Sequence, residues 1–179
     1  MTYFYWDASA LVKRYAPETG TEIVNHLFSA TTLDRMMCLS INTGEVISIF
    51  VRKRNDGIIA QEDFSQALLD FRSEVLDSDD FQVVSADDAL VLESHSLIEK
   101  HNLNATDALI LRSALDISGE FLEEDTLVLV SADLRLYRAA DQEGLQRLNP
   151  EDVSQEDLAG FLDIDDADDV DDVDDLSNR

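Results

Sequence analysis

Several short runs of apolar residues in this chain lack the polar alternation that a strand with one face in water would show. Tyr3–Trp6 consists of four aromatic residues, and Thr126–Val130 reads Thr-Leu-Val-Leu-Val. Runs of this kind are typical of strands that are buried on both faces, as in a parallel sheet. Met36–Ile41, Phe81–Val84 and Leu145–Leu148 are further strand candidates, the last one at an edge.

Segments with helical periodicity separate these runs. In Thr21–Ser29, for example, the apolar residues recur at positions that share one face of a helix. The same reasoning predicts helices over Ala8–Tyr15, Asn42–Arg54, Glu62–Leu76, Asp87–His101, Thr106–Leu115 and Ala132–Gln142. Strands that alternate with helices indicate an α/β fold, in which helices cover both faces of a parallel sheet.

The length and composition fit one folded domain with an appended tail. The chain has 179 residues, of which 45% are hydrophobic, so it can bury an ordinary core. Its last part, residues 151–179, contains 13 acids and one base, and like charges in such a run repel one another. We therefore expect a domain over residues 1–150 and an acidic, partly disordered tail over residues 151–179.

The sequence excludes several classes of protein. Cys38 is the only cysteine, which rules out an internal disulfide and a CxxC metal or redox site. No apolar run approaches the roughly 18 residues of a membrane span, and Met1–Arg14 lacks the apolar core of a signal peptide. We expect a cytoplasmic protein with no membrane role.

The net charge limits how this protein can meet a nucleic acid. At −26 it repels a polyanion at long range, so any binding depends on local groups of bases. Lys13–Arg14 and Arg52–Arg54 are two such groups. The second group has two open interpretations, because these bases could contact phosphates or could complete a helix C-terminus, where positive charge is favourable.

Four acidic residues lie at or near the places where strands lead into helices. In such sheets the ligand crevice lies beyond the carboxyl ends of the strands, so all four are candidates for one site. They are Asp7, Glu45, Asp107 and Asp133. Taken singly, each acid could serve as a helix cap, and Asn42 with Glu45 and Asn104 with Asp107 have the spacing of capping boxes.

Taken together, the four acids indicate a metal site. Carboxylates that converge without a counter-charge raise one another's pKa and destabilise the fold. A divalent cation removes that cost, and a set of oxygen ligands suits Mg²⁺ or Mn²⁺. Such ions commonly act in phosphoryl chemistry, where they activate water and neutralise charge on the phosphate.

The segments around the four acids resemble those of PIN-domain ribonucleases, and in particular of VapC-like toxins of type II toxin–antitoxin systems. The first acid lies in Tyr3–Tyr15, which reads YFYWDASALVKRY. The others lie in Asn-Thr-Gly-Glu-Val, Ala-Thr-Asp-Ala-Leu-Ile-Leu and Leu-Val-Ser-Ala-Asp-Leu-Arg-Leu. The order, the spacing and the strand–helix context of the acids match this family over roughly Thr2–Pro150.

This resemblance implies a three-layer α/β/α sandwich with a central, mostly parallel sheet of four to five strands. It also implies a Mg²⁺- or Mn²⁺-dependent endoribonuclease that leaves 5′-phosphate and 3′-hydroxyl ends. By the resemblance, the metal ligands are Asp7, Glu45, Asp107 and Asp133, the last one directly or through water. Ser9 would then orient Asp7, and Thr106 would orient Asp107 or cap its helix.

The resemblance also implies partners: an RNA substrate, a small antitoxin protein that covers the acidic site, and a second copy of the chain in a homodimer. Two alternatives stay open, namely a PIN-domain RNA-processing nuclease without an antitoxin and a catalytically silent PIN scaffold. The acidic tail is an addition to the family pattern. One hypothesis is that Asp163–Arg179 folds back onto the bases and competes with RNA, and the simpler one is that it only solubilises the protein.

Overall fold

A five-stranded sheet forms the centre of the computed structural model, which describes residues 1–162. The strand order is β3-β2-β1-β4-β5, and all neighbouring strands are parallel. The strands are β1 (Thr2–Trp6), β2 (Met36–Leu39), β3 (Gln82–Val84), β4 (Thr126–Val130) and β5 (Gln146–Leu148). The predicted parallel sheet is therefore confirmed.

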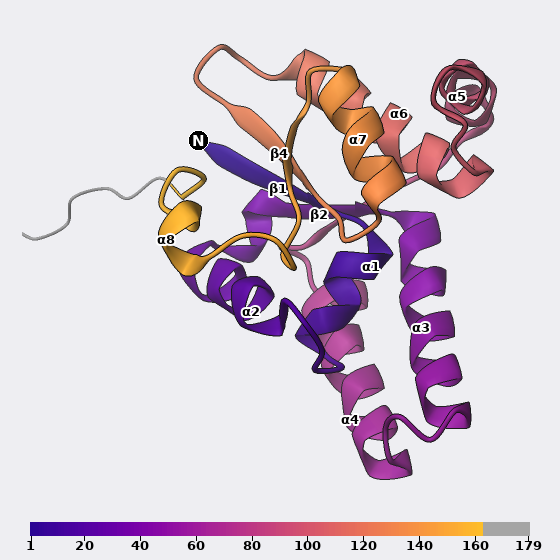
Figure 1. The fold of residues 1–179 in the computed structure, drawn as a ribbon, viewed down its shortest axis with the longest axis vertical. Coiled ribbons are helices and arrows are strands. Elements are labelled where there is room, and N and C mark those ends of the chain that lie inside the picture. The colour runs from indigo at the N-terminus through magenta and orange to yellow at the C-terminus, as the bar shows by residue number, and fades with distance from the viewer. Residues whose placement is uncertain (163–179) are drawn as a thin grey trace, which may run out of the picture.

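Helices cover both faces of this sheet, so the fold has three layers (Figure 1). One face packs against α1 (Ala8–Leu11), α2 (Thr21–Ala30), α3 (Ser40–Asn55), α4 (Gln61–Phe71) and α8 (Gln155–Leu158). The other face packs against α5 (Asp88–His101), α6 (Ala105–Glu120) and α7 (Leu134–Gln142). Short 3₁₀ turns lie at Val12–Arg14 and Leu33–Arg35, and a π-helical turn lies at Arg72–Leu76. The expected α/β/α sandwich is confirmed.

The first strand shows why the aromatic run has no polar residue. Successive side chains of a strand point to opposite faces of the sheet. Phe4 and Trp6 belong to the hydrophobic cluster on the α1–α4 side, whereas Tyr5 belongs to the cluster on the α5–α7 side. All three side chains are buried, so β1 contributes to both halves of the core at once.

The start of α3 differs from the prediction. The predicted strand Met36–Ile41 is too long, because β2 ends at the buried Leu39 and α3 begins directly at Ser40. Asn42 is therefore inside the helix and cannot cap it. Its buried amide instead donates a 2.8 Å hydrogen bond to the Trp6 carbonyl, which ties α3 to the end of β1. The predicted capping box with Glu45 is wrong for this reason.

Several helices also differ in extent from the sequence prediction. The helix expected over Glu62–Leu76, for example, is α4 up to Phe71, followed by the π-helical turn. The single helix expected over Ala8–Tyr15 is a short α-helix followed by the 3₁₀ turn. Conversely, α6 continues to Glu120 instead of ending at Leu115. Leu115 and Ile117 pack against the core, and this tertiary contact extends the helix. No helix within residues 1–162 is long and apolar enough to cross a bilayer.

The first residues of the expected tail pack against the domain. Leu158 of α8 is completely buried in the cluster on the α1–α4 side. The buried Lys13 donates to Glu151 at 2.6 Å and to Glu18 at 2.9 Å. Gly20 has φ +88°, and a Cβ there would lie 2.8 Å from the carbonyl oxygen of the proline at position 150, so this approach requires glycine. The hypothesis about Asp163–Arg179 concerns residues outside the described part of the chain.

Candidate active site

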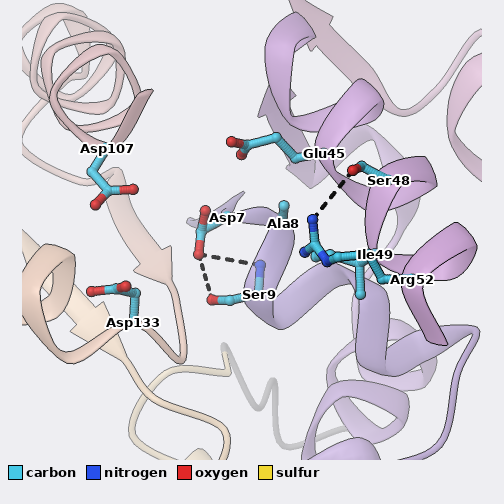
Figure 2. Close-up of a pocket in the computed structure, with 9 residues that line it drawn as sticks. All are labelled: Asp7, Ala8, Ser9, Glu45, Ser48, Ile49, Arg52, Asp107 and Asp133. Carbon is cyan, nitrogen blue, oxygen red and sulfur yellow. Dashed lines mark hydrogen bonds between the residues drawn. The ribbon is translucent and has the colours of Figure 1, made fainter. Parts of the chain in front are cut away.

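A pocket of about 340 Å³ opens where β1 and β4 lead into helices, at the carboxyl edge of the sheet. All four acids predicted from the sequence line it, although they come from four separate segments of the chain. The lining residues are Asp7, Ala8, Ser9, Glu45, Ser48, Ile49, Arg52, Asp107 and Asp133. Figure 2 shows the four carboxyl groups around one shared space.

Asp7 is the most buried of these acids. It follows β1, caps the N-terminus of α1 and is only 5% exposed. Its Oδ2 accepts hydrogen bonds from the Ser9 backbone N–H at 3.2 Å, from the Ser9 hydroxyl, and from the Ser131 hydroxyl at 3.0 Å. These bonds hold the carboxyl group in one orientation.

Two serines connect Asp7 to the loop after β4. The Ser9 hydroxyl accepts a hydrogen bond from the Ala132 N–H at 2.9 Å, and the Ser131 hydroxyl accepts one from the Asp133 N–H at 3.0 Å. The expected contact of Ser9 with Asp7 is present. Sequence reasoning missed the contact of Ser131 with Asp7, for which the only signal was the position of Ser131 two residues before an acid.

Glu45 lies on α3 and contacts the start of α6. Burial is the largest influence on the pKa of Glu45 and raises it, whereas a hydrogen bond with the Thr106 side chain acts weakly in the opposite direction. From the sequence, Thr106 is expected to orient Asp107 or to cap its helix. That acid is held instead by Asn104, whose Oδ1 accepts from the Asp107 N–H and whose amide donates to Asp107 Oδ2, both at 2.8 Å. The predicted cap of α6 by Asn104 is confirmed.

Capping and a role in the pocket do not exclude each other, because they use different oxygens. Asp133 caps α7 through Oδ1, which accepts from the N–H groups of Arg135 and Leu136 at 2.7 and 3.1 Å. Asp7 and Asp107 are both held through Oδ2. Each of these three acids therefore has a second carboxyl oxygen that these bonds leave for the pocket.

Burial raises the pKa values of Asp7, Glu45 and Asp107, and neighbouring acids add to the rise for Glu45 and Asp107. Burial is the largest cause for Asp7, and the hydrogen bonds from Ser9 and Ser131 only partly oppose the rise in its pKa. Burial and then the charge of Asp7 raise the pKa of Glu45. Burial, followed by the charges of Asp7 and Asp133, raises the pKa of Asp107 to about 6. The pocket thus concentrates negative charge that its own hydrogen bonds do not offset.

This donor set fits a hard divalent cation. It consists of carboxylate oxygens, which Mg²⁺ and Mn²⁺ prefer. Within residues 1–162, however, no three His, Cys, Asp or Glu side chains are already arranged as metal ligands. Mg²⁺ usually keeps several waters and binds one or two carboxylates directly, so more widely spaced acids can still hold it.

The parallel sheet with helices on both faces, and the acidic pocket at its carboxyl edge, place this chain in the class of α/β proteins with a site at the ends of the strands. The sequence matches the family model of the PIN domain over residues 4–142. The chain therefore belongs to the PIN-domain family, and the resemblance of its sequence to PIN domains is confirmed. Proteins of this family are generally nucleases that depend on divalent metal ions.

Several solved structures have a similar fold. FitAcB from Neisseria gonorrhoeae has 17% sequence identity and a TM-score of 0.56, over 84% of this chain and 99% of that chain. PAE2754 from Pyrobaculum aerophilum has 17% identity and a TM-score of 0.52, and the match covers 82% of this chain and 89% of that chain. FitAB bound to an IR36 DNA fragment has 16% identity and a TM-score of 0.54, and the match covers 84% of this chain and 97% of that chain. A comparison with curated proteins finds no match.

Proposed function

We propose that this chain is a divalent-metal-dependent endoribonuclease that acts as the toxin of a toxin–antitoxin pair. The observation that carries the proposal is the convergence of four carboxylates from four separate segments on one pocket. Clustered carboxylates destabilise a fold unless they serve a ligand that offsets their charge. The residues that would hold Mg²⁺ or Mn²⁺ are Asp7, Glu45, Asp107 and Asp133.

The reaction would be hydrolysis of a phosphodiester bond. When bound, the metal ion activates water and neutralises charge on the phosphate. The water oxygen bonds to phosphorus while the bond to the 3′ oxygen breaks, and that oxygen takes up a proton, which leaves 5′-phosphate and 3′-hydroxyl ends. Ser9 and Ser131 contribute by fixing Asp7, because a carboxyl group that is already oriented needs no reorganisation during the reaction.

The choice of RNA and of a toxin role rests on the resemblance of the sequence motifs to VapC-like toxins. A FitAB structure of the same fold has a bound DNA fragment, which supports a nucleic-acid context for this chain. The expected partners are an RNA substrate, a small antitoxin protein over the pocket and a second copy of the chain.

The test of the enzyme is cleavage of total RNA from a prokaryotic host, with the product ends mapped, in Mg²⁺, in Mn²⁺ and in EDTA. Wild type is compared with Asp7→Asn and with Asp79→Asn, which removes the same charge from an exposed site before β3. We expect discrete, metal-dependent cuts by wild type and Asp79→Asn only. Absence of cleavage, or equal cleavage by Asp7→Asn, would favour the silent scaffold.

The toxin role needs a separate test. Expression of wild type should slow growth of the host, expression of Asp7→Asn should not, and the protein encoded beside this chain should restore growth when co-expressed. If wild type cuts RNA but the neighbouring protein neither binds it nor inhibits it, the chain is an RNA-processing nuclease without an antitoxin.

A further inference from the structure

Arg52 is the one base among the residues that line the acidic pocket. It lies on α3 seven residues after Glu45, about two helical turns, so both side chains leave the same face of the helix. Figure 2 shows Asp107 and Asp133 on one side of the pocket, Arg52 on the opposite side, and Asp7 and Glu45 between them. The pocket therefore has an acidic part and a basic margin.

The two bases that follow Arg52 have other partners. Lys53 forms an ion pair with Glu18. Arg54 lies over the Phe64 ring at 4.4 Å and donates to Asn55 at 3.0 Å. The two interpretations of this basic group thus apply to different residues, since Lys53 and Arg54 stabilise the end of the helix and Arg52 faces the pocket.

Arg52 has a neutral partner although carboxylates are near. Its guanidinium donates a 3.2 Å hydrogen bond to the Ser48 hydroxyl, and no ion pair found within residues 1–162 includes it. Burial and the charge of Asp7 raise the pKa of Glu45, and the charge of Arg52 opposes this rise only in part. Figure 2 shows the Glu45 carboxyl group pointing away from Arg52. Arg52 is exposed, so most of its donors can bind a ligand.

We propose that Arg52 binds a phosphate of the RNA next to the phosphate that is cut, and so positions the strand over the four carboxylates. This inference rests on the proposed function. A guanidinium matches a phosphate with two parallel hydrogen bonds, which fixes orientation as well as position. A base at the margin also attracts a polyanion that the net charge of −26 otherwise repels. Arg52 is a positioning residue, because the reacting atoms lie at the carboxylates.

The first test measures RNA binding without cleavage. A fluorescein-labelled single-stranded RNA of random sequence is titrated, at several salt concentrations with Mg²⁺ present, into the full chain carrying Asp7→Asn. Adding Arg52→Gln should weaken binding about 10-fold and reduce the slope of log affinity against log salt by about 0.7, the value for one phosphate contact on a single strand. The matched control is Arg54→Gln, which removes the same charge two residues further along the helix and should leave the slope unchanged.

The second test measures cleavage in the otherwise wild-type chain. Arg52→Gln should raise KM for RNA more than it lowers kcat, and Arg52→Lys should restore part of the loss, because lysine keeps the charge but not the paired donors. If Arg52→Gln binds RNA with the parent's affinity and slope, if the control behaves identically, or if no chain binds RNA, the inference is wrong. If binding depends on Arg52 but wild type does not cut, the inference stands and the proposed nuclease activity fails.

Discussion

The Ser131 hydroxyl donates a 3.0 Å hydrogen bond to Oδ2 of Asp7, which joins the loop after β4 to the end of β1 across 124 residues of sequence. The same hydroxyl accepts a bond from the Asp133 N–H at 3.0 Å. One completely buried serine therefore sets the relative positions of two of the four acids. Both acids lie in the pocket, so a small change at Ser131 should affect the site as a whole.

We expect Ser131→Ala to weaken the site without removing any carboxylate. Loss of a partner that orients a metal ligand commonly costs about 10- to 100-fold in metal affinity or activity. Because the variant also leaves buried groups without a hydrogen bond, the free energy of unfolding should fall by about 1–3 kcal/mol. The measurements are Mg²⁺ titrations of RNA cleavage and denaturant unfolding.

The control for this variant is Ser65→Ala. The Ser65 hydroxyl bonds to the Gln61 carbonyl at 3.0 Å on the exposed surface of α4, so its loss should change little. Equal effects of the two substitutions on metal affinity would mean that Ser131 does not position the acids.

Asp7→Asn should separate function from stability. Asparagine can still accept the hydrogen bonds from Ser9 and Ser131, but it carries no buried charge. We expect cleavage to fall by about 100-fold or more, since the metal ion supplies several kcal/mol in the transition state. The midpoint of thermal unfolding in EDTA at pH 7 should rise, because burial raises the pKa of Asp7 and its ionised form opposes folding.

The outcome that contradicts this prediction is a variant that unfolds more easily and still cuts RNA. Asp7 would then act only as the cap of α1. The comparison protein is Asp79→Asn, whose changed side chain lies outside the pocket.

The strands and helices, and the grouping of the four acids at one edge of the sheet, were predictable because each depends on local sequence patterns. Uninterrupted apolar runs indicate buried strands, and acids and amides at cap positions indicate where helices begin. The start of α3 was misplaced because Asn42 bonds to the Trp6 carbonyl, a contact between distant segments that has no local signal. Similarly, the local sequence does not indicate that Ser131, among the nearby serines, or Arg52, among the nearby bases, faces the pocket.

The metal-free protein should lose stability as the pH rises. The pKa of Asp107 is raised from 3.8 to about 6, so the folded state binds this proton more tightly than the unfolded state does. The resulting stabilisation is present in full below the unfolded pKa and is lost as the pH rises through about 6. The raised pKa values of Asp7 and Glu45 act in the same direction. Thermal unfolding in EDTA from about pH 4 to pH 7 measures this loss.

Mg²⁺ should reverse the loss at pH 7, because the cation stabilises the ionised acids of the folded state. Asp107→Asn should make the pH dependence shallower, whereas Asp79→Asn should leave it unchanged. An identical pH dependence in all three proteins would mean that repulsion across the whole acidic surface, and not the pocket, causes the loss.

A chain that ends after Leu162 should be as stable as the full chain, whereas one that ends at the proline at position 150 should not. The shorter variant removes the buried Leu158 and the Glu151 partner of the buried Lys13. Loss of one large buried side chain typically costs about 2–5 kcal/mol, and denaturant unfolding of both variants and of Leu158→Ala measures it. If the shorter variant were fully stable, residues 151–162 would contribute nothing to the fold.

The variant that ends after Leu162 also tests the hypothesis about the acidic segment Asp163–Arg179. This segment contains nine acids and one base, so its removal lowers the negative charge of the chain substantially. If the segment competes with RNA for bases such as Arg52, the variant should bind labelled RNA more tightly at low salt. The difference should vanish at high salt, because added ions screen charge interactions beyond a few ångströms. Equal affinities at low salt would leave the segment with a solubilising role only.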